Sequence, residues 1–352
     1  MTKQTLSTPK TVNWKQVSLF VGLTIALSWL LDLVLWLKFG YSLYAQIFFQ
    51  LQMLIPAYVA IFLQRYVFKD SSLYLRTYRE RPRWFFNFYI IFTLFFTALV
   101  ILTTLRPDLY PAPLASLIMI ALVISLVVLL VIRFVSGKEA FQRAGLSGGK
   151  WYLWPLVWVV VMAYLGLQIL LNVVAGLGYQ PDITPLATAA GLHIPTYLVA
   201  GFLNTVIIGP LLGLLIAFGE EYGWRGYLQG ELVKLGRVKG VLMVGVIWGV
   251  WHAPAVAMGH NYPGYPVLGP IAFLVFNLFL SIFLGYLMLK TGSVWLAAFM
   301  HALLNQSYTW FVAMVYTPTD PLFSFGAGIY GIAFAFLVAF VILRDPVWKQ
   351  AL

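Results

Sequence analysis

Long apolar runs, separated by short polar segments, make up almost the whole chain. Each run extends over about 20 residues, enough for a helix to cross the roughly 30 Å hydrocarbon core of a bilayer. The runs mix Leu, Val, Ile, Phe and Gly without the alternation of polar and apolar residues typical of membrane β-strands. The pattern therefore predicts an all-α, polytopic integral membrane protein with about 8–10 transmembrane helices. We favour ten, at 17–37, 41–64, 84–105, 113–135, 152–178, 194–218, 238–258, 267–289, 293–316 and 324–343.

Composition supports exposure of the chain to lipid. Of the 352 residues, 62% are hydrophobic and 9% are charged, whereas ordinary soluble domains have roughly 25% charged residues. A soluble fold of this length could not bury so much apolar surface in one core. The chain has no cysteine, which excludes disulfides, thiolate metal sites and a cysteine nucleophile.

Basic residues are distributed unevenly between the two sides of the predicted membrane. If the N-terminus is cytoplasmic, all 22 Lys and Arg residues except Lys38 and Arg106 fall in cytoplasmic segments, in agreement with the positive-inside rule. Both termini are then cytoplasmic. The net charge of +11 reflects this topology signal, so we expect the lipid bilayer as a partner and no nucleic acid. The cluster RTYRERPR (Arg76–Arg83) could also contact anionic headgroups, although topology is the simpler interpretation.

Ionisable residues interrupt the apolar pattern at three places, and such residues at membrane depth are usually functional. The first is FGEEYGWRGYL, where the predicted helix 194–218 reaches the cytoplasmic side. Glu221 and Arg225 are four residues apart, so they face each other in the favourable acid-before-base order. Glu220 points about 100° away and lacks this cation, which leaves a carboxylate able to act as a general base for water. An ordinary helix end at the headgroups explains the triplet equally well.

The other two places carry histidine. In IWGVWHAPA, His252 lies one helical turn beyond Trp248. In LAAFMHALLNQ, His301 and Asn305 are four residues apart and share one helix face. Taken alone, His252 is more typical of a packed imidazole, and the His301–Asn305 pair could simply join two helices by hydrogen bonds.

Together, these side chains amount to a hydrolytic set on three separate helices. A carboxylate can take a proton from water, imidazoles can orient that water, and His and Asn can donate hydrogen bonds to an oxyanion. The set is Glu220, His252, His301 and Asn305. His193 and His260 lie near predicted helix ends and are interpreted as loop or interface residues. Two other classes of function stay open: a transporter that buries the same residues, and a scaffold or immunity protein without catalytic activity.

Three motifs carry a resemblance to a known family. They are Glu220-Glu221-x-x-x-Arg225, Trp248-x-x-x-His252 and His301-x-x-x-Asn305, each on its own apolar segment. In this order they resemble the signatures of the CAAX-protease and bacteriocin-processing family, which includes the endopeptidase that trims prenylated CAAX proteins and bacterial relatives called Abi proteins. The resemblance covers about residues 190–316. It departs from the usual pattern at Trp248, where the second signature commonly has phenylalanine.

The resemblance implies a multi-pass intramembrane endopeptidase, here of bacterial cell-membrane type, that acts on a peptide or membrane protein. It implies that Glu220 and His252 activate water, and that His301 and Asn305 line the oxyanion site. Further support then comes from Glu221, Arg225 and Trp248.

The family has also been described as metalloproteases, and a zinc ion could be held by Glu220, His252 and His301. The His-Glu-x-x-His spacing that makes a zinc prediction strong is absent. We therefore favour a metal-free mechanism without a cofactor. The expected organisation is an accessory set of helices at 1–150, a protease core at 151–320, and a last helix with a cytoplasmic tail at 321–352.

Overall fold

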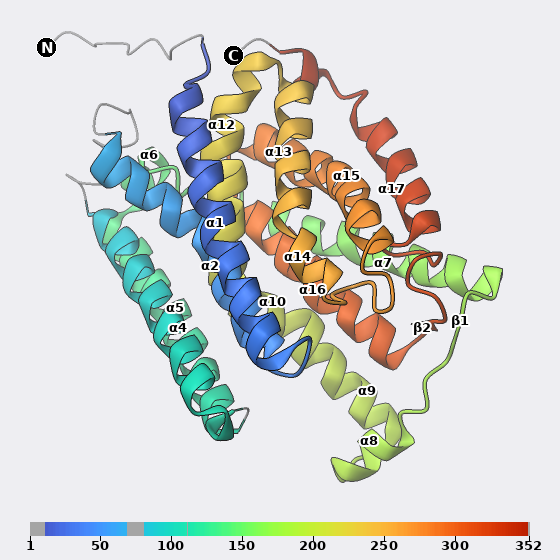
Figure 1. The fold of residues 1–352 in the computed structure, drawn as a ribbon. Coiled ribbons are helices and arrows are strands. Elements are labelled where there is room, and N and C mark those ends of the chain that lie inside the picture. Colours follow the sequence, from blue (N-terminus) through green and yellow to red (C-terminus); the bar gives the residue numbers. More distant parts are fainter. Residues whose placement is uncertain (1–10, 69–80, 111, 351–352) are drawn as a thin grey trace, which may run out of the picture.

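The computed structural model describes residues 11–68, 81–110 and 112–350, and this part of the chain is almost entirely helical (Figure 1). The first half contains α1 (Trp14–Phe39), α2 (Ala45–Phe62), η1 (Leu63–Val67), α4 (Arg83–Leu105), η2 (Pro107–Leu109), α5 (Ala112–Ser136), α6 (Lys138–Arg143) and α7 (Leu153–Ala175). The second half contains α8 (Thr184–Ala189), α9 (Ile194–Phe202), η3 (Leu203–Ile208), α10 (Gly209–Leu212), α11 (Leu214–Glu221), η4 (Tyr222–Leu228), α12 (Gln229–Leu232), η5 (Val233–Leu235), α13 (Arg237–Trp251), α14 (Ala253–Ala257), α15 (Leu268–Thr291), α16 (Val294–Met314), α17 (Ile329–Ile342) and η6 (Pro346–Lys349). Two short strands, β1 (Gly178–Tyr179) and β2 (Thr317–Pro318), pair antiparallel.

The predicted fold class is confirmed. Within the described residues, 7 helices are long and apolar enough to cross a membrane. The remaining predicted segments contain α13, α16 and α17, of which α13 and α17 have 15 and 14 residues. α16 has 21 residues but carries the polar His301 and Asn305. Every predicted apolar run therefore forms a helix. The three helices that are shorter or carry polar residues, α13, α16 and α17, all belong to the second half of the chain.

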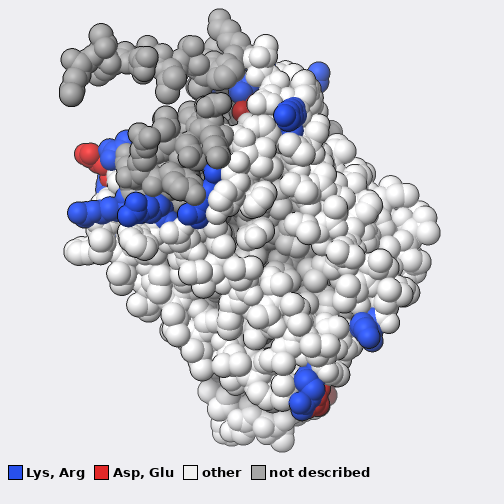
Figure 2. All heavy atoms as spheres, turned by 60° about the vertical axis from the view of Figure 1, so that its left-hand side comes forward, with Lys and Arg blue, Asp and Glu red and all other residues white. Residues whose placement is uncertain are grey.

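Charged side chains lie mainly at the two ends of the helices. On the face shown in Figure 2, a wide belt without Lys, Arg, Asp or Glu separates a basic upper end from a lower end that carries few charges. Large apolar side chains such as Leu30, Ile91 and Leu130 are more than half exposed, as lipid-facing residues must be. The start of α1 and the end of α17 lie at the same end of the molecule (Figure 1). Most of the loop 65–83, including most of the cluster Arg76–Arg83, lies outside the described residues.

Two pairs of glycines allow the helices that carry the candidate residues to pack closely on their neighbours. A Cβ atom on Gly219 would lie 2.3 Å from the Met53 carbonyl oxygen of α2. On α13, a Cβ atom on Gly249 would lie 2.8 Å from the Leu274 Cα of α15. Gly219 and Gly249 each have a second close-packed glycine four residues away, at Gly223 and Gly245, which is the small-xxx-small spacing of membrane helix interfaces.

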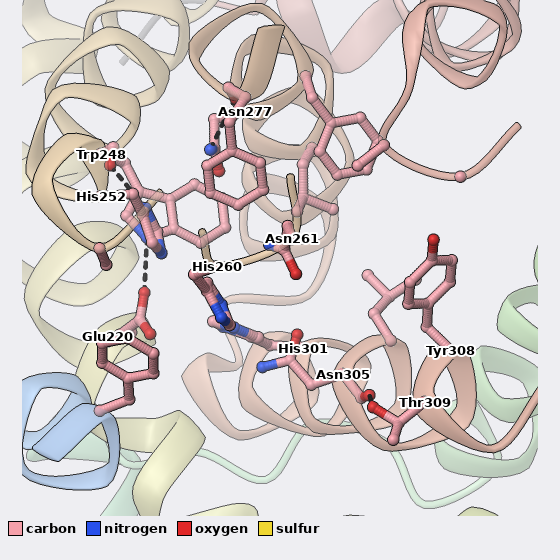
Figure 3. Close-up of a pocket in the computed structure, with 18 of the residues that line it drawn as sticks. Glu220, Trp248, His252, His260, Asn261, Asn277, His301, Asn305, Tyr308 and Thr309 are labelled. Carbon is pink, nitrogen blue, oxygen red and sulfur yellow. Dashed lines mark hydrogen bonds between the residues drawn. The ribbon is translucent and has the colours of Figure 1, made fainter. Parts of the chain in front are cut away.

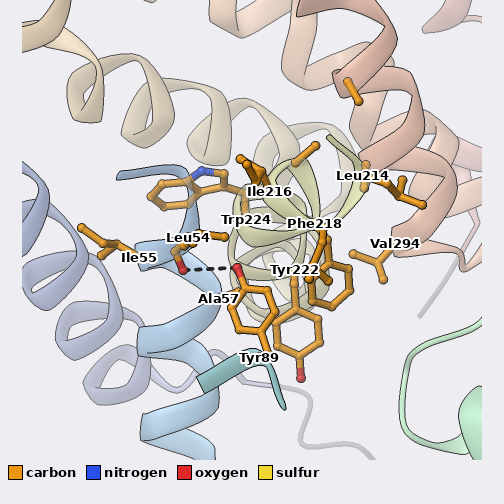
Figure 4. Close-up of a cluster of buried hydrophobic side chains, with 14 of the residues drawn as sticks. Leu54, Ile55, Ala57, Tyr89, Leu214, Ile216, Phe218, Tyr222, Trp224 and Val294 are labelled. Carbon is orange, nitrogen blue, oxygen red and sulfur yellow. Dashed lines mark hydrogen bonds between the residues drawn. The ribbon is translucent and has the colours of Figure 1, made fainter. Parts of the chain in front are cut away.

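Aromatic side chains fill the space around the α2–α11 contact. Phe218 stacks on Trp295 of α16 with ring centroids 4.3 Å apart and on Tyr222 at 5.1 Å. Tyr89 of α4 donates a hydrogen bond to the Leu54 carbonyl oxygen at 3.4 Å (Figure 4). The helix that carries the two glutamates is thus enclosed on several sides by α2, α4 and α16.

A ladder of polar side chains fixes α1 to the same core. Thr24, Ser28 and Asp32 repeat every four residues and are 0%, 0% and 2% exposed. Ser28 Oγ accepts a hydrogen bond from Trp251 Nε1 at 2.7 Å, and Asp32 Oδ2 accepts one from Gln52 Nε2 at 2.9 Å. α1 therefore holds the end of α13, directly before His252.

Gly219→Ala should destabilise the protein, because its Cβ would meet backbone atoms of Met53 and Leu54 as well as Tyr89 Oη. Overpacking of this kind costs about 1–3 kcal/mol, measurable as a lower thermal midpoint in detergent. Gly230→Ala is the matched control, since Gly230 is exposed on α12 with no atom near the added Cβ; it should be neutral or stabilise by about 0.4–1 kcal/mol. Equal midpoints for the two variants would contradict the close approach of α2 and α11.

Candidate active site

Glu220 and Glu221 lie deep in the molecule, not at the end of a span. The helical path does not stop near residue 218 as expected, but continues through η4 and α12 to Leu232, 12 residues beyond Glu220 and about 18 Å at helical rise. His252 follows Arg237, the first residue of α13, by 15 residues, or about 22 Å. Because α12 and α13 adjoin at their ends and run in opposite directions, both side chains reach a similar depth.

One cavity collects most of the predicted site residues. It has a volume of about 290 Å³, and its lining includes Glu220, Trp248, His252, His301 and Asn305. Figure 3 shows these side chains approaching the same space from three helical segments. Sequence spacing does not enforce such convergence, since the residues are up to 85 positions apart. Glu221 and Arg225 lie beside the cavity without lining it.

Behind the cavity, Glu221 forms a buried ion cluster. Its Oε1 atom accepts hydrogen bonds from Arg225 Nη1 at 3.1 Å and from His301 Nδ1 at 2.8 Å. The side chains of Glu221 and Arg225 are both 0% exposed. Buried charges are stable only when they are paired, so this contact explains why Glu221 and Arg225 occur together in the motif. It also fixes the orientation of the His301 ring.

Trp248 connects the cluster to Glu220. Its indole Nε1 donates a hydrogen bond of 2.5 Å to Glu220 Oε2. The face of the ring lies 4.2 Å from the Arg225 guanidinium carbon, a cation–π distance. Its edges meet the rings of His252 and His301 at centroid distances of 5.4 and 5.6 Å. The tryptophan at this position thus supplies a donor to the carboxylate that phenylalanine, common in the family signature, lacks.

The two histidines have different hydrogen-bond partners. His252 Nδ1 lies 2.8 Å from the Trp248 carbonyl oxygen. A carbonyl only accepts, so Nδ1 carries the proton and Nε2 of a neutral His252 has a free lone pair. The ring is held between Trp251 and Phe273, at centroid distances of 4.5 and 4.9 Å.

Asn305 presents its side chain differently from the buried groups. It lies one turn after His301 on α16 and is exposed to the cavity. Among the described residues its side-chain amide makes no hydrogen bond; only its backbone carbonyl is used, by Thr309 Oγ1 at 2.9 Å. The amide is therefore available to a bound molecule.

The loops that line the cavity do not lie at the basic end of the molecule that carries the chain termini (Figure 1). The lining includes His260 and Asn261 after α14, and Pro321, Gly326 and Ala327 before α17. These loops lie at the opposite end of α13, α15 and α17 from the chain termini (Figure 1). The basic stretch after Arg225 indicates the end of the helix but not the direction of the cavity, because the helix passes the cavity before it reaches that end.

The sequence interpretation did not assign several polar residues of the cavity wall to the site, among them His260 and Asn277. His260, interpreted as a loop residue, does lie in a loop, but it also lines the cavity, with Nδ1 3.4 Å from Tyr41 Oη. Asn277 of α15 is fully buried and donates to the Phe273 carbonyl oxygen at 2.9 Å, while its Oδ1 has no partner among the described residues. The available signal for Asn277 was one amide in the apolar run FLVFNLFL. His193 precedes α9 as an exposed cap residue, in line with its loop interpretation.

A zinc site needs three or four ligand side chains around one point. Within the described residues, no group of three or more His, Asp or Glu side chains is placed to hold a metal ion. Glu220 accepts from Trp248, and His301 Nδ1 is occupied by Glu221. Glu220, His252 and His301 are thus not placed as a set of metal ligands in the part of the chain that the structure describes, and we derive no step through a metal.

A serine nucleophile can be tested in the same way. The tetrapeptide Gly145-Leu146-Ser147-Gly148 has the Gly-x-Ser-Gly form used by rhomboid proteases. Ser147 lies in the loop between α6 and α7, where its Oγ accepts from the Gly149 backbone N–H at 3.2 Å. It does not line the cavity that contains the histidines, so His252 and His301 are not placed as its base.

Trp248→Phe should destabilise the protein through the lost hydrogen bond to Glu220. Phenylalanine keeps much of the ring contact but leaves a buried carboxylate without its donor, and bonds to charged groups contribute about 1.5–3 kcal/mol. Trp224→Phe is the control, because Trp224 is equally buried and its Nε1 has no partner among the described residues. Thermal unfolding should show the larger loss for Trp248→Phe; an equal loss would mean that the indole N–H contributes nothing.

Comparison with known proteins supports the motif assignment. Residues 202–307 match the family model described as type II CAAX prenyl endopeptidase Rce1-like, and all three motifs lie inside this segment. No curated protein and no solved structure matches the chain. The family match supports a CAAX-type intramembrane protease. The resemblance drawn from the three motifs is thus confirmed over residues 202–307, the segment that matches the model of Rce1-like type II CAAX prenyl endopeptidases.

Proposed function

We propose that this protein is an intramembrane endopeptidase that hydrolyses a peptide bond with water activated by Glu220 and His252. The observation that carries the proposal is the different environment of the two histidines in one cavity. His252 offers a lone pair toward the cavity, whereas His301 is held by a carboxylate. A hydrolase needs both a proton acceptor and an oxyanion donor, and this pair supplies one of each.

Glu220 and His252 form the side of the site that binds water. The Nδ1–H of His252 is engaged by the Trp248 carbonyl oxygen, so Nε2 can accept a hydrogen bond from water and orient it. The Glu220 carboxylate lines the same cavity and is 2% exposed. One of its oxygens is fixed by Trp248, which leaves the other to take the proton from that water.

His301 and Asn305 form the oxyanion side. With His301 protonated, the positive charges of His301 and Arg225 balance the negative charges of Glu220 and Glu221. Since buried charge must be compensated, this balance favours the imidazolium, whose Nε2–H is a donor. The Asn305 amide adds a second donor one helical turn away, exposed to the cavity.

The proposed reaction proceeds by direct attack of water, without a covalent bond between enzyme and substrate. Water attacks the scissile carbonyl carbon as its proton passes to Glu220, and the carbonyl oxygen becomes an oxyanion held by His301 and Asn305. The C–N bond then breaks and the proton on Glu220 moves to the leaving amine. The second proton of the water stays on the new carboxyl group and then passes to the released amine, so the products are a carboxylate and an ammonium group, and the enzyme returns to its starting state.

The cavity wall supports a membrane-associated substrate. Beside the polar groups it is lined by Phe49 and Met53 of α2, Phe276 and Leu280 of α15, and Leu304 of α16. An apolar segment or a prenyl-type group of a protein or peptide would match this wall. The positive-inside pattern supports a cytoplasmic position of both termini, with the cavity loops then on the opposite side.

Glu220→Gln should abolish most turnover while the protein stays folded, because glutamine can still accept from Trp248 but cannot take a proton. Loss of a general base costs about 10²–10⁴-fold. Glu221→Gln should instead lower stability, since removing one partner of a buried ion pair costs about 3–5 kcal/mol, and should leave residual activity. The measurements are cleavage rate on a peptide library in liposomes and thermal midpoint of each variant.

Two outcomes would contradict these roles. A near wild-type rate for Glu220→Gln together with a folded, inactive Glu221→Gln would reverse the two glutamates. Full activity of both folded variants would remove the hydrolase proposal and favour a transporter or a scaffold.

Asn305→Ala should lower kcat by about 10²–10³-fold, the usual cost of one oxyanion donor, with little change in thermal midpoint. The adjacent Gln306→Ala is the control, since Gln306 does not line the cavity. If Asn305→Ala raised KM and left kcat unchanged, Asn305 would bind substrate without stabilising the transition state.

A further inference from the structure

A second cavity shares no lining residue with the candidate active site and lies at the basic end of the helices. It has a volume of about 550 Å³ and is formed by the end of α5, by α6, by the loop before α7 and by the end of α15. Its lining includes four cationic side chains: Arg133, Lys138, Lys150 and Lys290. No Asp or Glu is among the described residues that line it. The reaction proposed above does not use this cavity.

The floor of this cavity is fixed by hydrogen bonds. Ser293 Oγ, at the start of α16, donates to the Ser147 carbonyl oxygen at 2.7 Å. Trp154 Nε1 donates to the Gly148 carbonyl oxygen at 3.0 Å. Phe141 and Leu146, which also line it, are 2% and 0% exposed. The loop 146–150 is therefore held in place, and the cavity does not depend on mobile surface side chains for its shape.

Two of the cations are oriented by aromatic rings. The Arg133 guanidinium carbon lies 5.6 Å from the centroid of Phe141, and Lys150 Nζ lies 5.8 Å from that of Tyr152. Lys290 has an acidic partner outside the cavity lining, Asp345, at 2.9 Å. Among the described residues, Arg133, Lys138 and Lys150 have no acidic partner, and the Ser147 hydroxyl and the Gln142 amide lie around them as further polar groups.

The position of the cavity points to a lipid rather than a soluble ligand. Phe134 and Trp151 directly follow Arg133 and Lys150 in sequence and are 88% and 82% exposed. Exposed tryptophan beside basic residues is typical of the headgroup level of a membrane. Basic side chains gather at this end of the molecule (Figure 2), the end that carries the chain termini. A basic pocket between spans at this depth matches the phosphate of an anionic headgroup.

We propose that this cavity binds the phosphate headgroup of an anionic membrane lipid, with its acyl chains beside the exposed apolar side chains of α5 and α7. Arg133, Lys138 and Lys150 contact the phosphate, and the backbone of the loop 146–150 closes the site from below. The site is separate from proteolysis, so a failure of one proposal leaves the other intact.

The test compares lipid binding by the full-length protein and two charge-matched variants. Arg133→Gln/Lys138→Gln/Lys150→Gln removes the cavity cations, and Lys15→Gln/Arg344→Gln/Lys349→Gln removes three cations at the same end that do not line the cavity. The probe is phosphatidylglycerol against phosphatidylcholine in mixed vesicles, read as lipid retained by purified protein in native mass spectrometry. Each cation near an anionic surface contributes roughly a fivefold factor, so the cavity variant should lose its preference by about 100-fold.

The control variant should keep most of that preference, and high salt should weaken binding in the wild type. An equal loss in both variants would show general surface attraction and overturn the proposal. Inorganic phosphate that raises the thermal midpoint as much as phosphatidylglycerol would assign the site to a free anion, and an acidic peptide that binds there in place of lipid would assign it to a protein segment. Either result contradicts a lipid site.

Discussion

Charge buried at membrane depth must be neutralised locally, and this requirement organises the centre of the protein. Glu221 accepts from Arg225 on its own helical segment and from His301 on α16. One carboxylate thus fixes the relation between α11, η4 and α16. A shift of one of these helices along the other would break the pairing, because either partner left alone would be a buried, uncompensated charge. The close packing of α11 on α2 at Gly219 holds the cluster in the interior.

Given this cluster, what the other side chains of the site can do depends on which of their polar atoms have no hydrogen-bond partner among the described residues. Glu221 is committed to its cations, and Glu220 faces Trp248 and the cavity. In the described part of the chain, both histidines have only Nε2 free. The partner of Nδ1 is a carboxylate for His301 and a backbone carbonyl oxygen for His252. The sequence does not distinguish the two histidines, but their different partners are the basis of the opposite roles that we propose for them. Helices outside the family segment take part as well: α1 holds Trp251 through Ser28, and α2 supplies part of the cavity wall.

The sequence was sufficient for the fold class, the family and the set of residues at the centre. Apolar length gives the helices directly, and the i,i+4 spacing of Glu221 and Arg225 gives their pairing, since both depend only on local geometry. The depth of Glu220 in the molecule and the direction of the cavity were not predictable in the same way. A helix interrupted by the π-helical segments η3 and η4 carries Glu220 past the expected end of its span, and the cavity direction depends on loops such as that at His260. The hydrogen bond from Trp248 to Glu220 joins side chains of two separate helices and depends on their tertiary arrangement.

The most direct test of the account is hydrolysis in water labelled with heavy oxygen. Purified wild-type protein and Glu220→Gln would be reconstituted with membrane-anchored peptides, and the product masses would be measured. The account predicts that wild type yields new peptide carboxylates containing the heavy oxygen, and that Glu220→Gln, although folded, yields none at the same cleavage position. Equal amounts of labelled product from both proteins would contradict the account. Peptides left intact by the wild-type protein would contradict it as well.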